Sequence, residues 1–326
     1  MPPTVTQRAQ PDAAPPTPSE LFSIIVAAYN AERTIMSCLE SALAQTLTDF
    51  EVIVVYTGSA DATGELARSF ADHRVRVVEQ PKRGIAAARN SGIAAARGKI
   101  ICFLDSDDLL LPGYLAAVDE AFARRPEAAW VYTDAWAFDD RTRRIRKRTA
   151  MAYGNGRPPA PDPATADAMF RKLLEANFVF NSAAVRASAL AAVGSFDESV
   201  VAAEDWELWL RLAAHGFVAA RAPGQHAIYR LHQQQASKNE AQTARSVVSI
   251  LEKVLGSYPL SAADRPLVEQ TLRRSRRSLE VVEKAHPWLV LRHRLQHALM
   301  RLRSSIDWYR HPPAAVAEAF ADLDRL

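Results

Sequence analysis

Cysteine is scarce in this sequence of 326 residues, and long apolar runs are missing from it. The two cysteines, Cys38 and Cys102, lie in apolar periodic stretches, which predicts buried free thiols and fits a reducing compartment. No segment approaches the roughly 20 apolar residues of a membrane-spanning helix. Residues 1–19 are rich in Pro, Thr, Gln and Ala and lack the apolar centre of a signal peptide. We therefore expect a cytoplasmic protein with a disordered leader at residues 1–19.

A strong charge excess is also absent, because the net charge is only +3 at pH 7. The local exception is the run RTRRIRKR at residues 141–148. This run is interpreted either as a solvated hairpin edge or as a surface that attracts anionic lipid headgroups. No interleaved aromatic residues accompany it, so we expect no nucleic-acid partner. The glycine-rich dinucleotide fingerprint is missing as well, which disfavours a hydride-transferring enzyme.

Apolar strands alternate with helical patterns four times in the first third of the chain. Because the strands are nearly continuous in apolar residues, the pattern predicts an α/β fold with a parallel sheet covered on both faces. Further strands and helices follow, and helical spacing broken by prolines dominates from residue 240 onward. The expected strands are residues 22–28, 50–55, 74–80, 99–104, 128–138 and 178–186, with short strands up to residue 232, and the expected helices include residues 61–71, 84–97, 164–176 and 203–216.

Polar residues follow three of these strands at the points where they end. They are Tyr29-Asn30, Thr57-Gly58-Ser59 and the acidic stretch 105–108. Parallel sheets bind ligands at the carboxyl ends of their strands, so these clusters predict one binding edge. Carboxylates placed there require a positive partner.

The segment KRGIAAARNSGIAAARGKIICFLDSDD, together with SIIVAAYNAERTI, VGSFDE, EDWELWLRLA and YRLHQQQAS, resembles the inverting family-2 glycosyltransferases of the GT-A fold. The resemblance covers about residues 22–237. It implies a Rossmann-like, mostly parallel sheet in a catalytic domain at 20–239, with a nucleotide-sugar half at about 20–110 and an acceptor half at about 111–239. Residues 240–326 would form a helical C-terminal extension.

The resemblance also implies a nucleotide-sugar donor and a Mn²⁺ or Mg²⁺ ion. Asp105 falls where relatives bind the donor's ribose, and Asp107 where they bind the metal. Hard divalent cations prefer such oxygen ligands. His232 falls where relatives place a histidine near the metal or diphosphate. For Asp108, capping of the next helix is an equal alternative.

Asp205 falls on the family's catalytic-base position. Inversion needs a carboxylate that removes the acceptor hydroxyl's proton, and burial beside Trp206 and Trp209 would raise its pKa toward a useful value. Glu204 is the competing assignment. The alternative to catalysis is an acidic helix start favoured by the helix dipole.

Three further residues are assigned to the donor. Tyr29 is expected to stack on the nucleobase, and Arg83 to meet the diphosphate near a helix N-terminus, in preference to Arg89, which is interpreted as an exposed face. Tyr56 and Thr57 replace the family's Asp pair, so Thr57 would accept the base's N–H without charge assistance. UDP-, dTDP- and GDP-linked donors all remain open, and an inactive site is the alternative.

Trp206 and Asp134 are the candidate acceptor contacts, together with Asn181 and Ser182. Trp206 is equally interpreted as a core residue. The apolar and basic residues near the C-terminus indicate packing on the catalytic domain, a dimer contact, or peripheral contact with the inner face of a membrane. The Gln-x-x-Arg-Trp motif of the processive synthases is absent, which favours single-sugar addition.

The sequence therefore predicts a metal-dependent, inverting glycosyltransferase that moves one sugar to a glycan or lipid-linked acceptor, such as a bacterial surface polysaccharide precursor. A non-catalytic sugar-nucleotide-binding or scaffold protein is the first alternative. A nucleotidyltransferase is disfavoured, because AAYNAERTI supplies no Gly-rich, basic loop.

Overall fold

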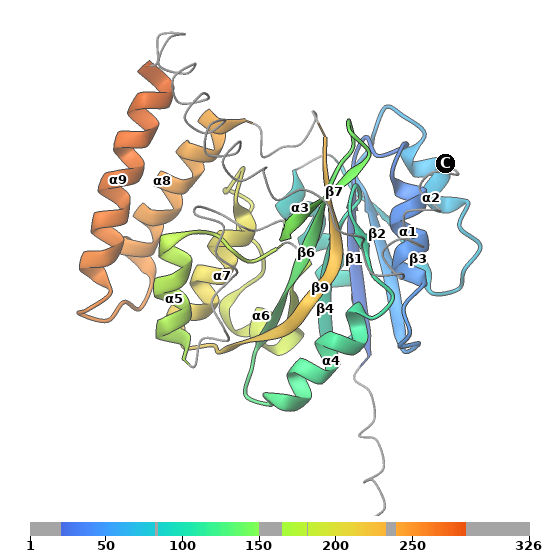
Figure 1. Ribbon diagram of the computed structural model, residues 1–326, viewed down its shortest axis with the longest axis horizontal. Helices are drawn as coiled ribbons and strands as arrows, with labels where there is room; N and C mark the ends of the chain where they lie inside the picture. The colour runs from blue at the N-terminus through green and yellow to red at the C-terminus, as the bar shows by residue number, and fades with distance from the viewer. Residues whose placement is uncertain (1–20, 82–83, 150–164, 181, 233–238, 285–326) are drawn as a thin grey trace, which may run out of the picture.

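The computed structural model of the protein describes residues 21–81, 84–149, 165–180, 182–232 and 239–284. A sheet of nine strands forms its centre, in the order β3-β2-β1-β4-β8-β6-β9-β5, with β7 paired to β6 (Figure 1). The leader expected at residues 1–19 and the tail from residue 285 lie outside the described residues.

The first half of the sheet is parallel, as predicted from the alternating pattern. Each pair of neighbours among the first four strands runs in the same direction. The strands are β1 (Phe22–Ala28), β2 (Phe50–Tyr56), β3 (Val75–Glu79) and β4 (Ile100–Asp105), and the helices between them are α1 (Ile35–Leu43), α2 (Thr63–Arg68) and α3 (Ile85–Ala95).

The second half of the sheet is mixed. The short strand β8 pairs antiparallel with both of its neighbours, β4 and β6, whereas β6 and β9 are parallel. The strands of this half are β5 (Leu109–Leu110), β6 (Trp130–Asp139), β7 (Arg144–Thr149), β8 (Ala184–Arg186) and β9 (Ala219–Leu231).

Two sequence predictions about this half were wrong. The strand expected at residues 178–186 spans only 184–186, since β8 pairs with just three residues of β4 and two of β6. The short strands expected up to residue 232 are part of one strand, β9. That strand stays continuous because its register against β6 shifts between Tyr132 and Ala135, which absorbs Pro223 and Gly224.

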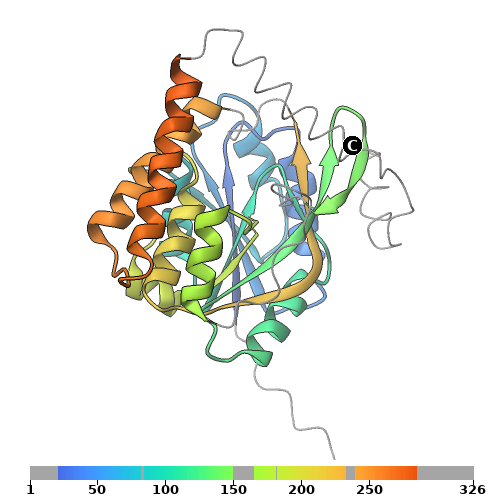
Figure 2. The ribbon, with the colours of Figure 1, turned by 60° about the vertical axis from the view of Figure 1, so that its left-hand side comes forward.

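Helices cover both faces of the sheet. The side chains of α1, α2 and α4 join one core cluster with the sheet, and those of α3 and α5 to α9 join the other. Figures 1 and 2 both place α5, α7, α8 and α9 together on one side of the sheet. The helices of the second half are α4 (Tyr114–Arg124), α5 (Ala166–Glu175), α6 (Ala187–Val193), α7 (Glu204–Ala214), α8 (Glu240–Ser257) and α9 (Arg265–Lys284).

The core confirms the prediction for the cysteines, because Cys38 and Cys102 are both buried and free. The two C-terminal helices share this interior, since Leu251, Val254 and Val268 are fully buried in the cluster that also holds Trp209. Within the described part of the chain, no helix is both long and apolar enough to span a membrane.

Candidate active site

The parallel register brings the polar strand ends to one edge of the sheet. Ala28 of β1 lies opposite Tyr56 of β2, and Ala27 lies opposite Asp105 of β4. The residues that follow these strands therefore start from neighbouring points, as expected for a binding edge at the carboxyl ends of parallel strands.

An acidic corner occupies this edge. Asp105, Asp107 and Asp108 each offer a carboxylate oxygen, and these oxygens lie within 4.8 Å of one another. His232, at the end of β9, places its Nε2 2.7 Å from Asp107 Oδ2. The side chains of Asp105 and Asp107 are 25% and 31% exposed. Such a set of accessible carboxylates beside an imidazole fits Mg²⁺ or Mn²⁺.

Asp108 has a different role in this corner. It is 1% exposed, and its Oδ1 accepts a hydrogen bond of 2.9 Å from the Arg230 backbone N–H. The Arg230 side chain donates in turn to the Asp107 carbonyl at 3.0 Å. Asp108 thus joins the turn after β4 to the end of β9, and it is less accessible to a cation than Asp105 and Asp107.

Arg89 is the main correction to the sequence analysis. The interpretation of an exposed face was wrong, because Arg89 is 3% exposed. Its guanidinium donates to Asp105 Oδ1 at 2.8 Å and to Glu204 Oε1 at 2.6 Å. Three small residues before it, Ala86–Ala88, let α3 pack closely on the sheet, and this places the cation between β4 and α7.

Glu204 and Asp205 begin α7 and differ in their surroundings. Glu204 is 7% exposed and is held by Arg89, whereas Asp205 is half-buried, with the Asn177 amide 3.4 and 3.5 Å from its carboxylate oxygens. Burial raises the pKa of Glu204 to about 7, although Arg89 opposes the shift. Burial also raises the pKa of Asp205, again against the effect of Arg89. Of the two carboxylates, Asp205 is therefore the more exposed.

The ends of β2 and β3 form an open pocket of about 320 Å³, lined by Tyr56, Gly58, Glu79, Gln80 and Pro81. Tyr29 directly follows β1 and is 42% exposed. Thr57 is 5% exposed, and its hydroxyl donates to the Ala28 carbonyl at 3.4 Å.

The assignments of Tyr29 and Thr57 to the donor stay predictions. Tyr29 is exposed, and the Thr57 hydroxyl donates to the Ala28 carbonyl. Arg83, assigned to the diphosphate, lies outside the described residues.

The two acceptor candidates are engaged by internal contacts. Asp134 is 1% exposed and pairs with Arg221 at 2.7 Å; burial raises its pKa, against the effect of Arg221. Trp206 is 5% exposed, and its indole N–H donates to the Leu173 carbonyl at 2.9 Å. Their role in acceptor binding stays a prediction. Ser182 is buried, and Asn181 lies outside the described residues.

Sequence reasoning missed Asn177, whose amide lies beside Asp205. It lies just after α5, 28 positions before the aspartate, and no motif marks it. Only the packing of α5 against α7 brings the two side chains together.

The arrangement of the sheet and its helices is that of a known fold. Solved structures with the same fold are GT-A glycosyltransferases. They include Staphylococcus aureus TarS in complex with UDP-GlcNAc, at a TM-score of 0.61 and 17% identity over 82% of this chain and 76% of that chain. The mannosyltransferase PcManGT from Pyrobaculum calidifontis, in complex with GDP-Man and Mn²⁺, aligns at a TM-score of 0.59 and 18% identity over 96% of this chain and 90% of that chain. At such identities the likeness establishes the fold.

The family follows from the sequence itself. The family model for glycosyl transferase family 2 matches residues 23–194, which is more than half of the chain, so this protein belongs to glycosyl transferase family 2.

Curated relatives match parts of the chain. The succinoglycan biosynthesis protein ExoO of Rhizobium meliloti is 34% identical over 237 residues, or 70% of this chain and 65% of that protein. The chondroitin synthase of Escherichia coli is 32% identical over 198 residues, or 60% of this chain and 27% of the synthase. The glycosyltransferase EpsJ of Bacillus subtilis is 50% identical over 90 residues, or 27% of this chain and 26% of EpsJ. The chain thus matches less than two thirds of the length of each relative.

Proposed function

We propose that this protein is a metal-dependent, inverting glycosyltransferase that moves one sugar from a nucleotide-sugar donor to an acceptor hydroxyl. The observation that carries the proposal is the position of Arg89. One buried guanidinium contacts both Asp105 of the acidic corner and Glu204, the neighbour of Asp205. A donor held at the corner would therefore have its reacting carbon close to the half-buried Asp205 carboxylate.

In this proposal Asp107 and His232 hold the metal, and Asp105 binds the donor's ribose. A bound divalent cation neutralises charge that develops on the leaving diphosphate. Asp205 accepts the acceptor hydroxyl's proton while that oxygen bonds to the anomeric carbon. The bond from this carbon to the diphosphate oxygen breaks on the opposite side, and the nucleoside diphosphate leaves with the bonding electrons. Configuration at the anomeric carbon inverts, because only one displacement occurs.

The neighbours and relatives support a proposal about the substrates. Structures of the same fold hold UDP-GlcNAc or GDP-Man, and the names of two relatives refer to succinoglycan and chondroitin. We propose a UDP-, dTDP- or GDP-linked donor and a glycan or lipid-linked acceptor in polysaccharide synthesis. A cytoplasmic location with peripheral membrane contact, and a division into residues 20–239 and 240–326, are parts of the same proposal.

The test is a thermal-shift screen of nucleotide sugars with and without Mn²⁺, followed by a transfer assay. Ligands that bind only the folded protein raise its melting temperature. We expect a Mn²⁺-dependent shift in the wild type that is lost in Asp107→Asn. Asp205→Asn should keep the shift and lose turnover by roughly 10²- to 10⁴-fold. Glu127→Gln, whose side chain is 61% exposed beside Arg125, is the control and should behave like the wild type. Equal turnover in the wild type and Asp107→Asn would refute metal-dependent transfer.

A non-catalytic sugar-nucleotide-binding protein is the second candidate. Tyr56 and Thr57 stand where the resemblance expects two aspartates, so neither offers the base a carboxylate. Their hydroxyls donate to the Ser59 and Ala28 carbonyls at 3.0 and 3.4 Å. This candidate predicts a donor-induced thermal shift without release of nucleoside diphosphate, in the presence of Mn²⁺ and any acceptor.

A further inference from the structure

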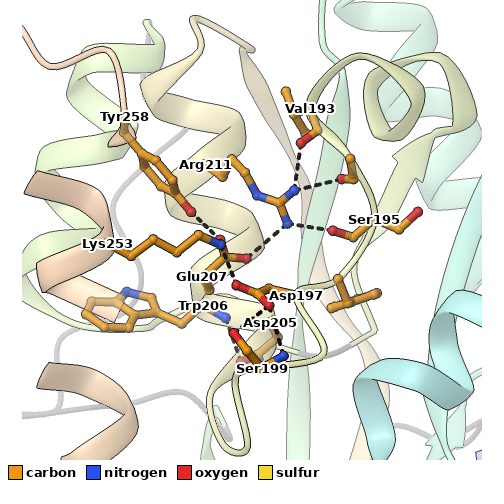
Figure 3. A network of polar contacts seen from close by, with 12 residues as sticks. Val193, Ser195, Asp197, Ser199, Asp205, Trp206, Glu207, Arg211, Lys253 and Tyr258 are labelled. Carbon is orange, nitrogen blue, oxygen red and sulfur yellow. Dashed lines mark hydrogen bonds and ion pairs between the residues drawn. The ribbon is translucent and has the colours of Figure 1, made fainter. Parts of the chain in front are cut away.

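Polar side chains of α8, and of the residue directly after it, contact α7 and the loop before α7 (Figure 3). Lys253 Nζ lies 2.7 Å from Glu207 Oε1 on α7 and 2.6 Å from Asp197 Oδ2. The hydroxyl of Tyr258, directly after α8, donates to the same Glu207 oxygen. Arg211 donates to the other Glu207 oxygen at 3.0 Å. We call these five residues the α7–α8 cluster.

The charges in this cluster are balanced. Glu207 is fully buried, and a buried carboxylate is stable only with charged and hydrogen-bonding partners. Two carboxylates, Asp197 and Glu207, face two cations, Lys253 and Arg211. Burial and the nearby Glu207 charge raise the pKa of Tyr258, so its hydroxyl stays a donor. Lys253 of α8 and Tyr258 directly after it are thus both bonded to Glu207 Oε1 on α7.

The same cluster also holds the loop that leads into α7. Arg211 donates to the carbonyls of Val193, Gly194 and Ser195 at 2.7, 3.1 and 2.6 Å. Gly194 permits this approach, because its φ is +89° and an added Cβ would lie 3.0 Å from the Arg211 guanidinium. Asp197 accepts from the Ser199 backbone and hydroxyl, at 2.9 and 2.7 Å. Loop 194–203 is thus attached to α7 at one end and to α8 through Lys253.

A further contact from α8 reaches the backbone three residues before the candidate base. Ser246 Oγ accepts a hydrogen bond of 3.2 Å from the Ala202 backbone N–H. The next residue, Ala203, has a φ of +60°, a left-handed conformation that alanine rarely adopts. Such a conformation persists only where surrounding contacts impose it. Glu204 and Asp205 follow at once, and Glu207 lies two positions after Asp205.

We propose that Lys253 and Tyr258 are positioning residues of the transfer reaction. They touch neither donor nor acceptor, but they hold loop 194–203 and the first turn of α7 so that Asp205 stays beside Arg89 and the acidic corner. The inference rests on the proposed function of Asp205 as the base. It adds a part of the chain beyond the matched residues 23–194 to the support of the active site.

The experiment compares Lys253→Met and Tyr258→Phe with Arg276→Met. The control breaks the 2.7 Å pair between Arg276 of α9 and Glu252 of α8, whose side chains are 56% and 47% exposed. We expect kcat of Lys253→Met to fall roughly 10-fold to 100-fold with a donor KM within about twofold of wild type, since small misplacements of a catalytic group cost this much. Tyr258→Phe should show a smaller fall of the same kind, Lys253→Arg should restore most of kcat, and Arg276→Met should match the wild type.

Hydrogen–deuterium exchange of peptides from residues 196–210 provides a readout that does not depend on turnover. We expect faster exchange in Lys253→Met and wild-type exchange in Arg276→Met. If Lys253→Met does not fold, the double variant Glu207→Gln/Lys253→Met removes the stranded buried charge and takes its place in both measurements.

Three outcomes would overturn the inference. The first is a kcat of Lys253→Met within twofold of wild type despite a lower melting temperature. The second is an equal fall of kcat in Lys253→Met and Arg276→Met. The third is unaltered hydrogen–deuterium exchange of residues 196–210 in Lys253→Met. A wild-type protein without transfer activity would contradict the proposed function instead, and the exchange measurement would still decide whether α8 orders the start of α7.

Discussion

Arg89 connects parts of the chain that are far apart in sequence. It comes from α3, Asp105 from β4 and Glu204 from α7, 115 positions away from Arg89. The guanidinium also lies over the Phe196 ring, 5.2 Å from its centroid. A cation buried to this degree is stabilised only by the carboxylates that surround it, and their burial depends equally on the cation.

Replacement of Arg89 by methionine should therefore be strongly destabilising. We expect Arg89→Met to lower the free energy of unfolding by about 3–5 kcal/mol, because it leaves the buried Glu204 and the partly exposed Asp105 without their partner. Arg124→Met, which breaks an exposed pair with Glu120, should cost less than about 0.5 kcal/mol. Urea unfolding of both variants measures the difference, and similar losses would show that the Arg89 pairs contribute no more than a surface pair.

The raised pKa of Glu204 makes stability depend on pH. Its pKa rises from the ordinary value of 4.5 to about 7 on folding, so the folded protein binds this proton more tightly than the unfolded chain. The resulting stability is present below about pH 4.5 and is lost as pH rises through about 7. We expect the melting temperature of the wild type to fall more steeply between about pH 5 and pH 8 than that of Glu204→Gln. Parallel curves for the two proteins would contradict this.

At the scale of elements, close packing of α3 on the sheet is what brings Arg89 into the site. An alanine-rich helix presents little side chain to the strands beneath it, and Gly92 presents none. A Cβ at position 92 would lie 2.4 Å from Ile25 Cγ2 of β1. The approach of helix to strand at this point is thus set by the missing side chain.

Gly92→Ala should destabilise the protein although alanine favours helices. We expect a loss of about 1–3 kcal/mol in the free energy of unfolding, since α3 must move away from β1. Gly256→Ala on α8 is the matched control, because nothing lies within 4 Å of a Cβ built there. It should stabilise by up to about 1 kcal/mol. Thermal melts of both variants test the pair, and a stabilising Gly92→Ala would refute the close contact.

Elements dominated by local pattern could be predicted from the sequence, and those decided by distant pairing could not. The strand of residues 22–28 was predicted with the bounds that β1 has, because its apolar run ends at polar residues on the carboxyl side. β8 and β9 depend on partners far away in the chain, so the patterns gave the wrong lengths. The carboxylates at the strand ends could be predicted as well, because they directly follow an apolar run in the sequence. The burial of Arg89 and the contact of Asn177 with Asp205 arise from packing between helices, which helical spacing does not specify.

At the scale of the whole molecule, helices α8 and α9 share one core cluster with the sheet. The core cluster around Trp130 and Trp209, which stack with centroids 5.0 Å apart, also contains Leu251 of α8 and Leu272 of α9. The C-terminal helices therefore contribute to the stability of the sheet domain.

Leu251→Ala tests this shared interior. Leu251 is fully buried, and its truncation should lower the free energy of unfolding by about 2–5 kcal/mol. We expect one transition that moves as a unit when it is followed by both tryptophan fluorescence and far-UV circular dichroism. An unmoved fluorescence transition would mean that the α8 region unfolds separately from the sheet.

The ion pair between Glu207 and Lys253 has a consequence for chimeric enzymes. A hybrid that joins residues up to 239 of this chain to the C-terminal helices of another family member would bring a foreign side chain opposite Glu207. Unless that residue is again a cation with a side chain as long as that of lysine, the hybrid would carry an uncompensated negative charge in the first turn of α7. The C-terminal helices can therefore be exchanged between family members only where the residue opposite Glu207 stays positively charged.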